Sequence, residues 1–151
     1  MNLKIIQLGI IHLNDCVDLD QKSLNGLWTR SQWSIELTDH KRICLGIIDF
    51  EAKKLLGLCS AWIVLNELQI TVIAVHPFHQ RKGVGKILLT DLIKRSKSFQ
   101  TKYIHLEVKD TNESAKAFYK SMGFKKLVKR PKFYKDGSDA LLFNKETNNR
   151  S

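Results

Sequence analysis

The chain has 151 residues, of which 43% are hydrophobic and 26% are charged. This length and apolar content suit one domain that buries its own core, and they exclude a disordered chain. No apolar run approaches the ~20 residues of a membrane-spanning helix, and the first residues lack the apolar stretch of a secretory signal. The three cysteines, Cys16, Cys44 and Cys59, show no metal-binding or disulfide spacing, so we expect no metal and a reducing cytoplasm.

The net charge of +10 is distributed unevenly along the chain. Residues 1–75 contain 7 Lys/Arg and 8 Asp/Glu, whereas residues 76–151 contain 18 and 7. An anionic ligand or partner is therefore expected to meet the second half. The densest basic stretch contains Lys125, Lys126, Lys129, Arg130, Lys132 and Lys135. Its charge alone does not choose between a solvated face, an acidic cofactor, a ribosome-like surface and nucleic acid.

The first half of the chain predicts a strand, two helices and a three-stranded meander. A first strand is expected over Leu3–Leu8, and a helix over His12–Ser23. Ser34 could cap a short second helix that continues to about His40. Three branched apolar runs with short connections then predict antiparallel strands over Ile43–Phe50, Leu55–Val64 and Glu67–Val75.

The second half predicts two further helices and three strands. One helix is indicated by apolar residues at helical spacing, namely Val84, Ile87, Leu88, Leu92 and Ile93. Tyr103–Val108 alternates as a strand, and a helix is expected from Asn112 to about Met122, with Gly123 ending it. Closing strands are expected over Leu127–Tyr134 and Ala140–Asn144. We expect a single domain over residues 1–144 and a disordered tail over residues 145–151.

The segment from Val75 to Lys86 carries the strongest chemical signal. It reads VHPFHQRKGVGK, so a strand ends, Pro77 turns the chain, and two glycines open a helix. A helix start presents free N–H groups and partial positive charge, and glycine lets a ligand approach that backbone closely. With the charges of its basic side chains, the segment is suited to holding a pyrophosphate.

Two common phosphate motifs do not fit this segment. A dinucleotide fingerprint needs a third glycine at residue 88, which is Leu88, and the nucleotide P-loop ends in Lys-Ser/Thr, which is absent. A short Gly-x-Gly also occurs in ordinary loops. The upstream Gln80-Arg81, the preceding strand and the following amphipathic helix favour an anion site over that alternative.

The segment Gln80–Gly85, QRKGVG, resembles the pyrophosphate motif of the GNAT superfamily of acyl-CoA-dependent N-acyltransferases. The resemblance extends to Leu106–Val108, to Ala117–Phe124 and to the C-terminal hairpin. The pattern is most similar to bacterial enzymes that acetylate the N-terminal alanine of a small-subunit ribosomal protein, and the Trp33-Ser34 pair fits that subfamily. The resemblance implies an α+β fold with a mixed, mostly antiparallel sheet of about seven strands, about four helices and splayed strands 4 and 5.

The resemblance also implies how acetyl-CoA is bound. The backbone of Ile73, Ala74 and Val75 would pair with pantetheine while their side chains pack in the core. The pyrophosphate would lie on the loop and helix start formed by Arg81, Lys82, Gly83, Val84, Gly85 and Lys86. Asn112 would either bond the cofactor or cap its helix, and the sequence leaves both open.

Glu107 and Tyr119 match the base and acid positions of the ribosomal-protein subfamily. Glu107 lies on the strand face opposite Leu106 and Val108, and Tyr119 lies beside the apolar stripe of its helix. A phenol with an unperturbed pKa of ~10 is protonated at neutral pH and can donate to a departing thiolate. A solvated carboxylate and a half-buried structural tyrosine are the alternatives.

The acceptor is less defined by the sequence than the cofactor. An α-amine of pKa ~8 loses its proton at a cost about 3.3 kcal/mol lower than lysine at ~10.4, which favours a protein N-terminus over a lysine or small amine. Relatives often carry a tyrosine pair followed by proline, whereas this chain has Phe133, Tyr134 and Lys135, so Tyr134 is a weaker substrate-binding candidate. We expect direct transfer to a protein N-terminus, with a lysine or small-amine acceptor as the alternative. A nucleic-acid-binding module or an acyl-CoA sensor would be a different class. No membrane or direct nucleic-acid binding is expected, although the basic half could approach a ribosome.

Overall fold

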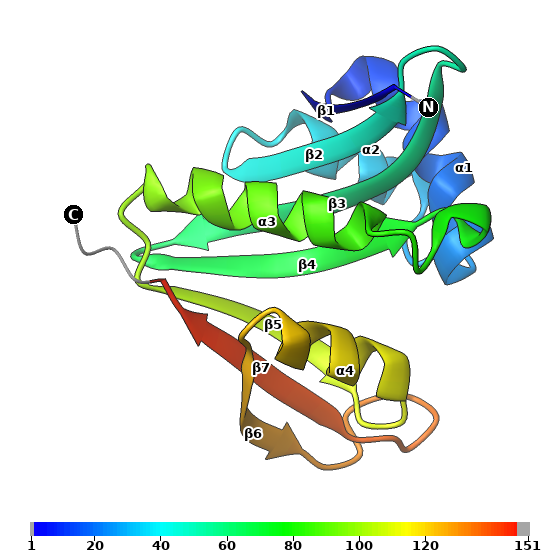
Figure 1. Cartoon of the computed structure of the whole chain (residues 1–151). Coiled ribbons are helices and arrows are strands. Elements are labelled where there is room, and N and C mark those ends of the chain that lie inside the picture. Colours follow the sequence, from blue (N-terminus) through cyan, green and yellow to red (C-terminus); the bar gives the residue numbers. More distant parts are fainter. Residues whose placement is uncertain (1, 148–151) are drawn as a thin grey trace. The chain divides into compact units, whose positions relative to one another are not determined.

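The computed structural model of the protein describes residues 2–147 (Figure 1). Its strands are hydrogen-bonded in the order β1-β2-β3-β4-β5-β7-β6. The strand bounds are β1 Leu3–Gln7, β2 Arg42–Asp49, β3 Lys54–Val64, β4 Glu67–Val75, β5 Tyr103–Lys109, β6 Lys125–Arg130 and β7 Ala140–Glu146. The α-helices are α1 Leu13–Leu24, α2 Arg30–Thr38, α3 Val84–Lys97 and α4 Glu113–Ser121, with short 3-10 turns at Ile10–His12 and Pro77–His79.

The sheet is mostly antiparallel, as expected from the short connections between its strands. The exception is a parallel ladder that joins Glu67–Gln69 of β4 to Tyr103–His105 of β5. The described part of the chain divides into two compact units, which we call the first unit (residues 2–62 and 70–95) and the second unit (residues 63–69 and 96–147). The mixed sheet and the four α-helices confirm the predicted fold class.

The first unit packs its helices on both faces of β1–β4. α1 and α2 cover one face and α3 covers the other (Figure 1). The core on the α1 and α2 side contains Leu8, Cys16, Leu19, Trp33, Leu37, Cys44, Leu58, Val72 and Ala74. On the α3 side, Gly57 of β3 leaves room for Val84 and Leu88, since a Cβ there would lie 3.0 Å from each of them. Close packing therefore fixes the first turn of α3 against the sheet.

The cap of the second helix, Thr29, lies five residues before the expected cap. The Oγ1 of Thr29 accepts the Gln32 N–H at 3.1 Å, and the Gln32 side chain accepts the Thr29 N–H at 2.8 Å. This reciprocal capping box fixes the start, so the prediction that Ser34 caps the helix is wrong. Ser34 lies inside α2, where its carbonyl accepts a hydrogen bond from the Thr38 hydroxyl.

The apolar stripe of α3 differs from the predicted stripe at two positions. Ile87 is 41% exposed, whereas Leu89 is fully buried with Leu88 and Leu92. The run of three adjacent apolar residues at this point fits two helical registers. Packing against the sheet selects the register that buries the two leucines.

The second unit buries the alternating residues of β5 beneath its neighbours. Ile104, Leu106 and Val108 are buried, as the alternation predicts, together with Phe124 and Phe143. β6 is the last strand in the order, and each of its residues is exposed. An exposed edge rich in lysine resists pairing with another chain.

The C-terminal strands also differ from the prediction at their ends. β6 ends at Arg130, because the following residues form turns in which Tyr134 donates its N–H to the Ser138 carbonyl. β7 continues through Lys145 and Glu146, and the buried Thr147 donates its N–H to Lys102. The expected disordered tail is therefore wrong for residues 145–147, while residues 148–151 lie outside the described part. Within residues 2–147, no helix is both long and apolar enough to cross a membrane.

Candidate active site

The glycine segment connects β4 to α3 through a short 3-10 turn. The imidazole Nδ1 of His76 accepts the Phe78 N–H at 3.2 Å, and Pro77 begins the turn. Gln80 then reaches back, and its Nε2 donates to the Val75 carbonyl at 3.1 Å. The loop is thus tied to the strand end that precedes it.

Two residues of this loop have left-handed backbone conformations. Arg81 has φ +63° and Gly83 has φ +86°. Left-handed residues beside ordinary ones turn successive N–H groups toward one point, which creates a concave site for an anion. A Cβ added at Gly83 would meet nothing within 4 Å, so open space lies beside this backbone. Holding arginine in this conformation costs free energy, and such strain concentrates at ligand sites.

The start of α3 adds further donors to the loop. Gly83 accepts the first helical hydrogen bond, from the Ile87 N–H at 3.0 Å. The N–H groups of Val84, Gly85 and Lys86 precede that bond and have no partner one turn earlier in the helix. Arg81, Lys82 and Lys86 have exposed side chains, while the Val84 side chain is buried. The segment therefore presents backbone donors and three cations to solvent while its apolar residue anchors it.

The end of β4 carries the backbone expected to bind pantetheine. Ala74 is buried in the core of the first unit, as predicted for its side chain. The Val75 carbonyl accepts hydrogen bonds from the Ser23 hydroxyl at 2.9 Å and from Gln80. Both lone pairs of that oxygen are therefore engaged. Of the Val75 backbone groups expected to hydrogen-bond with pantetheine, only the N–H group remains a candidate.

Glu107 lies on the exposed face of β5, opposite the buried residues, as predicted from the alternation. Its Oε1 lies 3.2 Å from Nη1 of Arg130 on β6. The register that places β7 between β5 and β6 pairs Glu107 with Leu142 and Arg130 with Ala140. The ion pair therefore spans the intervening strand and restrains the orientation of the carboxylate.

Tyr134 lies in the loop between β6 and β7 and faces charged residues. The Nζ of Lys109 lies 5.1 Å from the centre of its ring. Burial, together with the negative charge of Glu107, raises the pKa of the Tyr134 phenol. The loop is held by Asp136, which accepts hydrogen bonds from Ser138 and pairs with Lys109 at 3.1 Å. Tyr134 is therefore a protonated phenol in the electrostatic field of Glu107.

Tyr119 and Asn112 belong to α4. The Tyr119 ring packs edge-on against Phe118 and Phe124, with ring centres 5.2 and 5.8 Å apart. The Asn112 Oδ1 accepts the Ala115 N–H at 3.0 Å, so of its two expected roles the structure contains the helix cap. Tyr119 is half-buried, as expected for a residue beside the apolar stripe.

The structure divides the predicted site residues between the two units. The first unit contains the end of β4 and the loop from Arg81 to Lys86, and the second contains Glu107, Asn112, Tyr119 and Tyr134. The sequence analysis missed Arg130 as the partner of Glu107. Only the strand register brings these two residues together, so no local pattern reveals the pair.

The cysteines are unsuited to nucleophilic catalysis. All three are buried and free, and burial raises the pKa of Cys16 and Cys59 to about 12 and that of Cys44 to about 11. A thiol with such a pKa holds almost no thiolate at neutral pH. Among residues 2–147, no group of three or more His, Cys, Asp or Glu side chains could hold a metal ion.

The fold and the glycine loop place this protein in the class of acyltransferases. The sequence comparison identifies the family. The family described as "Acetyltransferase (GNAT) family" matches residues 13–124. The chain belongs to this family and is an N-acetyltransferase, with acetyl-CoA as its acetyl donor.

Two curated relatives share one named activity. The chain is 29% identical, over 83% of each chain, to a putative ribosomal protein bS18-alanine N-acetyltransferase of Bacillus subtilis. It is 35% identical to the Escherichia coli ribosomal protein bS18-alanine N-acetyltransferase, over 59% of this chain and 62% of that protein.

Solved structures show the same fold. The ribosomal-protein-S18-alanine N-acetyltransferase of E. coli superposes with a TM-score of 0.88 at 25% identity, over 96% of this chain and 94% of that one. Arabidopsis thaliana NAA60 in complex with acetyl-CoA superposes with a TM-score of 0.89 at 16% identity, over 97% and 99% of the two chains.

Proposed function

We propose that this enzyme transfers the acetyl group of acetyl-CoA directly to the N-terminal α-amine of a protein, namely the N-terminal alanine of a small-subunit ribosomal protein in the cytoplasm. The observation that carries the cofactor part is the left-handed loop at Arg81 and Gly83 that leads into α3. The named activity of the two bacterial relatives supports the acceptor.

In this proposal the loop and the first turn of α3 hold the pyrophosphate. The N–H groups of Val84, Gly85 and Lys86 donate to phosphate oxygens, and the partial positive charge of the helix start favours the anion. Arg81, Lys82 and Lys86 add charge that exposed side chains can bring to the ligand. The backbone of Ile73 and Ala74 and the N–H of Val75 pair with the pantetheine arm.

We assign the two proton transfers of the reaction to Glu107 and Tyr119. Glu107 accepts the proton that the α-amine loses as its nitrogen attacks the thioester carbon. The C–N bond forms as the C–S bond breaks, and the Tyr119 hydroxyl donates a proton to the departing thiolate. The raised pKa values of the buried cysteines favour this direct route over an acetyl-cysteine intermediate.

Tyr134 is assigned to the acceptor. Its phenol lies in the loop between β6 and β7, and burial together with the charge of Glu107 raises its pKa, so a protonated hydroxyl lies within the electrostatic field of the base. Phe133 packs edge-on against Tyr134 with ring centres 5.1 Å apart. It is the residue that the family resemblance matches to the first tyrosine of the pair often found in relatives. The acceptor site is therefore expected to have one hydroxyl fewer than those relatives.

Calorimetric titration with acetyl-CoA tests the cofactor site. We expect sub-millimolar binding by the wild-type protein and loss of binding in Gly85→Glu, because the new carboxylate occupies the helix start and repels the phosphates. The absence of binding to the intact wild-type protein would refute the cofactor assignment.

Steady-state kinetics then test the acceptor and the catalytic residues. An alanine-first ribosomal peptide should be acetylated with a higher kcat/KM than an N-terminally blocked lysine peptide. Glu107→Gln and Tyr119→Phe should each lower kcat about a hundredfold while leaving acetyl-CoA affinity nearly unchanged. Preference for the lysine peptide or for a polyamine would favour the alternative acceptor, and unchanged kcat in both variants would refute the assigned roles.

A further inference from the structure

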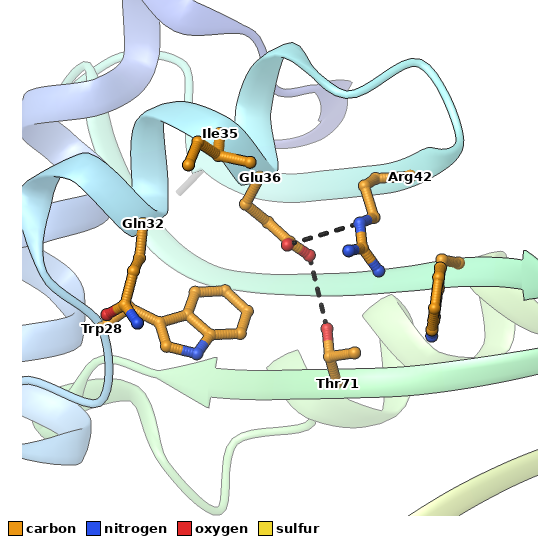
Figure 2. Close-up of a pocket in the computed structure, with 7 residues that line it drawn as sticks. Trp28, Gln32, Ile35, Glu36, Arg42 and Thr71 are labelled. Carbon is orange, nitrogen blue, oxygen red and sulfur yellow. Dashed lines mark hydrogen bonds and ion pairs between the residues drawn. The ribbon is translucent and has the colours of Figure 1, made fainter.

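The first unit contains a cavity of about 360 Å³ that the glycine loop does not form. It lies between α2 and strands β2–β4, beside the segment that joins α1 to α2 (Figure 2). Its lining combines two indoles with polar side chains, namely Trp28, Gln32, Glu36, Arg42, Trp62 and Thr71.

Glu36 places a buried carboxylate in this cavity. The residue is 8% exposed, and its Oε2 accepts hydrogen bonds from the Ser60 hydroxyl at 2.5 Å and the Thr71 hydroxyl at 3.5 Å. Its Oε1 lies 3.5 Å from Nε of Arg42, which also lines the cavity. An ionised carboxylate oxygen can accept more than one charge-assisted hydrogen bond, so this oxygen is also suited to a ligand that brings a charged N–H group.

Arg42 shows which kind of group the lining already accommodates. Its guanidinium carbon lies 4.2 Å from the centre of the Trp62 ring. Its Nε lies 3.5 Å from Glu36 and 3.4 Å from Asp39, yet it has no hydrogen-bond partner among the described residues. One guanidinium thus faces two carboxylates, and the Lys41 N–H, together with the positive charge of Arg42, lowers the pKa of Asp39. The immediate surroundings therefore favour a second cation.

Trp28 supplies the aromatic surface for that second cation. Its indole extends into the cavity, on the far side from Arg42 (Figure 2). The Trp28 ring makes an edge-on contact with Trp33, with ring centres 4.7 Å apart. The backbone N–H of Trp28 donates to the buried Asp20 carboxylate, which fixes the residue in place. No cation lies over its ring among the described residues, so this face can receive one.

We propose that this cavity binds an alkylammonium or guanidinium group of the acceptor, which stacks on Trp28 and donates to Oε1 of Glu36. The assignment to the acceptor rests on the proposed function. Thr71 of the lining precedes Ile73 by two residues on β4, a rise of about 7 Å along the strand. The cavity is thus close to the backbone assigned to pantetheine. The charge distribution fits as well, since residues 1–75 have 8 acidic and 7 basic residues, whereas residues 76–151 have 7 and 18.

Binding of the cation can be measured without acetyl transfer. The protein has three tryptophans, so agmatine can be titrated while the three indole N–H signals are followed by NMR. We expect saturable shifts of the Trp28 and Trp62 signals. The buried Trp33, whose indole donates to Asp20 at 2.7 Å, should stay unchanged as an internal control. The neutral analogue butylurea should shift none of the three.

Two variants locate the binding. Glu36→Gln removes the charge, and Trp28→Leu removes the stacking surface while leaving the hydrogen bonds of Glu36 intact. Each should weaken agmatine binding at least tenfold, whereas the exposed control Glu51→Gln should not change it. Thermal melting confirms that each variant is folded. Absence of shifts in the wild-type protein, or equal binding by wild type and folded Trp28→Leu, would overturn the proposal.

Peptide kinetics identify the source of the cation. Alanine-first peptides with arginine at positions two to four should have a KM about tenfold lower than matched peptides with citrulline, its neutral isostere. This ratio should fall to about one in Trp28→Leu. If agmatine binds but the two peptides are equivalent, the assignment to the acceptor is overturned. If agmatine binds but no peptide is acetylated, the cavity site stands and the proposed function fails.

Discussion

Gly83→Ala separates backbone strain from ligand binding at the proposed pyrophosphate site. Gly83 has φ +86°, and a Cβ there would meet no protein atom within 4 Å. The substitution therefore costs only the left-handed conformation, about 1 kcal/mol of the free energy of unfolding. In a chain of this length, that loss should lower Tm by about 3 °C.

Gly137 provides a matched control. It has φ +83°, its Cβ would also meet nothing within 4 Å, and it lies in the loop between β6 and β7. Gly137→Ala should therefore lower Tm by about the same amount. Only Gly83→Ala places a methyl group where the phosphates are expected to approach, so only that variant should lose acetyl-CoA affinity.

The expected loss of affinity follows from the donors at the loop. A hydrogen bond to a charged group contributes about 1.5–3 kcal/mol, so displacing one phosphate contact should raise the acetyl-CoA Kd about 10- to 100-fold. Isothermal calorimetry measures the Kd, and thermal melting measures the strain. If both variants melt alike and bind acetyl-CoA alike, the Gly83 backbone does not contact the cofactor.

Three further predictions concern stability and pH. Asp20→Asn should lower the free energy of unfolding in urea by about 2 kcal/mol. The buried carboxylate accepts the Leu27 N–H, the Trp28 backbone N–H and the Trp33 indole N–H, whereas an amide offers them only one acceptor oxygen. An unchanged midpoint would contradict this. Gly57→Ala should cost about 1–3 kcal/mol, since its Cβ would lie 3.2 Å from a strand carbonyl and 3.0 Å from α3 side chains, and it should also weaken acetyl-CoA binding. Burial and the charge of Lys22 lower the pKa of His76, so its contribution to stability is present above about pH 6.5 and is lost as the pH falls through the lower folded value. NMR titration should give an imidazole pKa below 6.5, and a value above it would refute this.

The sequence predicts those helices and strands whose hydrophobic pattern fits only one assignment of buried and exposed positions. The bounds of Glu67–Val75 are those observed, and the alternation in β5 places Glu107 on the correct face. The helical pattern of α3 does not predict which residues are buried, because its adjacent apolar residues fit two registers. Only contact with the sheet buries Leu89 in place of Ile87. The start of α2 was missed since serine and threonine are both good caps, and the Gln32 side chain decides between them.

The polar contacts of the interior were beyond the sequence analysis. Glu36 bonds to Ser60 and Thr71, which lie 24 and 35 residues away, and no local spacing connects them. Asp20 reads as one of several acids on a helix, yet it is buried beneath the loop that carries Trp28. The glycine loop was predictable because its donors, turn and helix are contiguous in the chain, which is also why the cofactor is better defined than the acceptor.

A titration of the isotope-labelled wild-type protein with coenzyme A, followed through its backbone amide signals by NMR, tests the central claim most directly. We predict that the amides of residues 81–86 show the largest saturable shifts, and that desulfo-pantetheine, which lacks the diphosphate, leaves them nearly unchanged. Shifts that spare residues 81–86 while the ligand binds elsewhere would contradict the account.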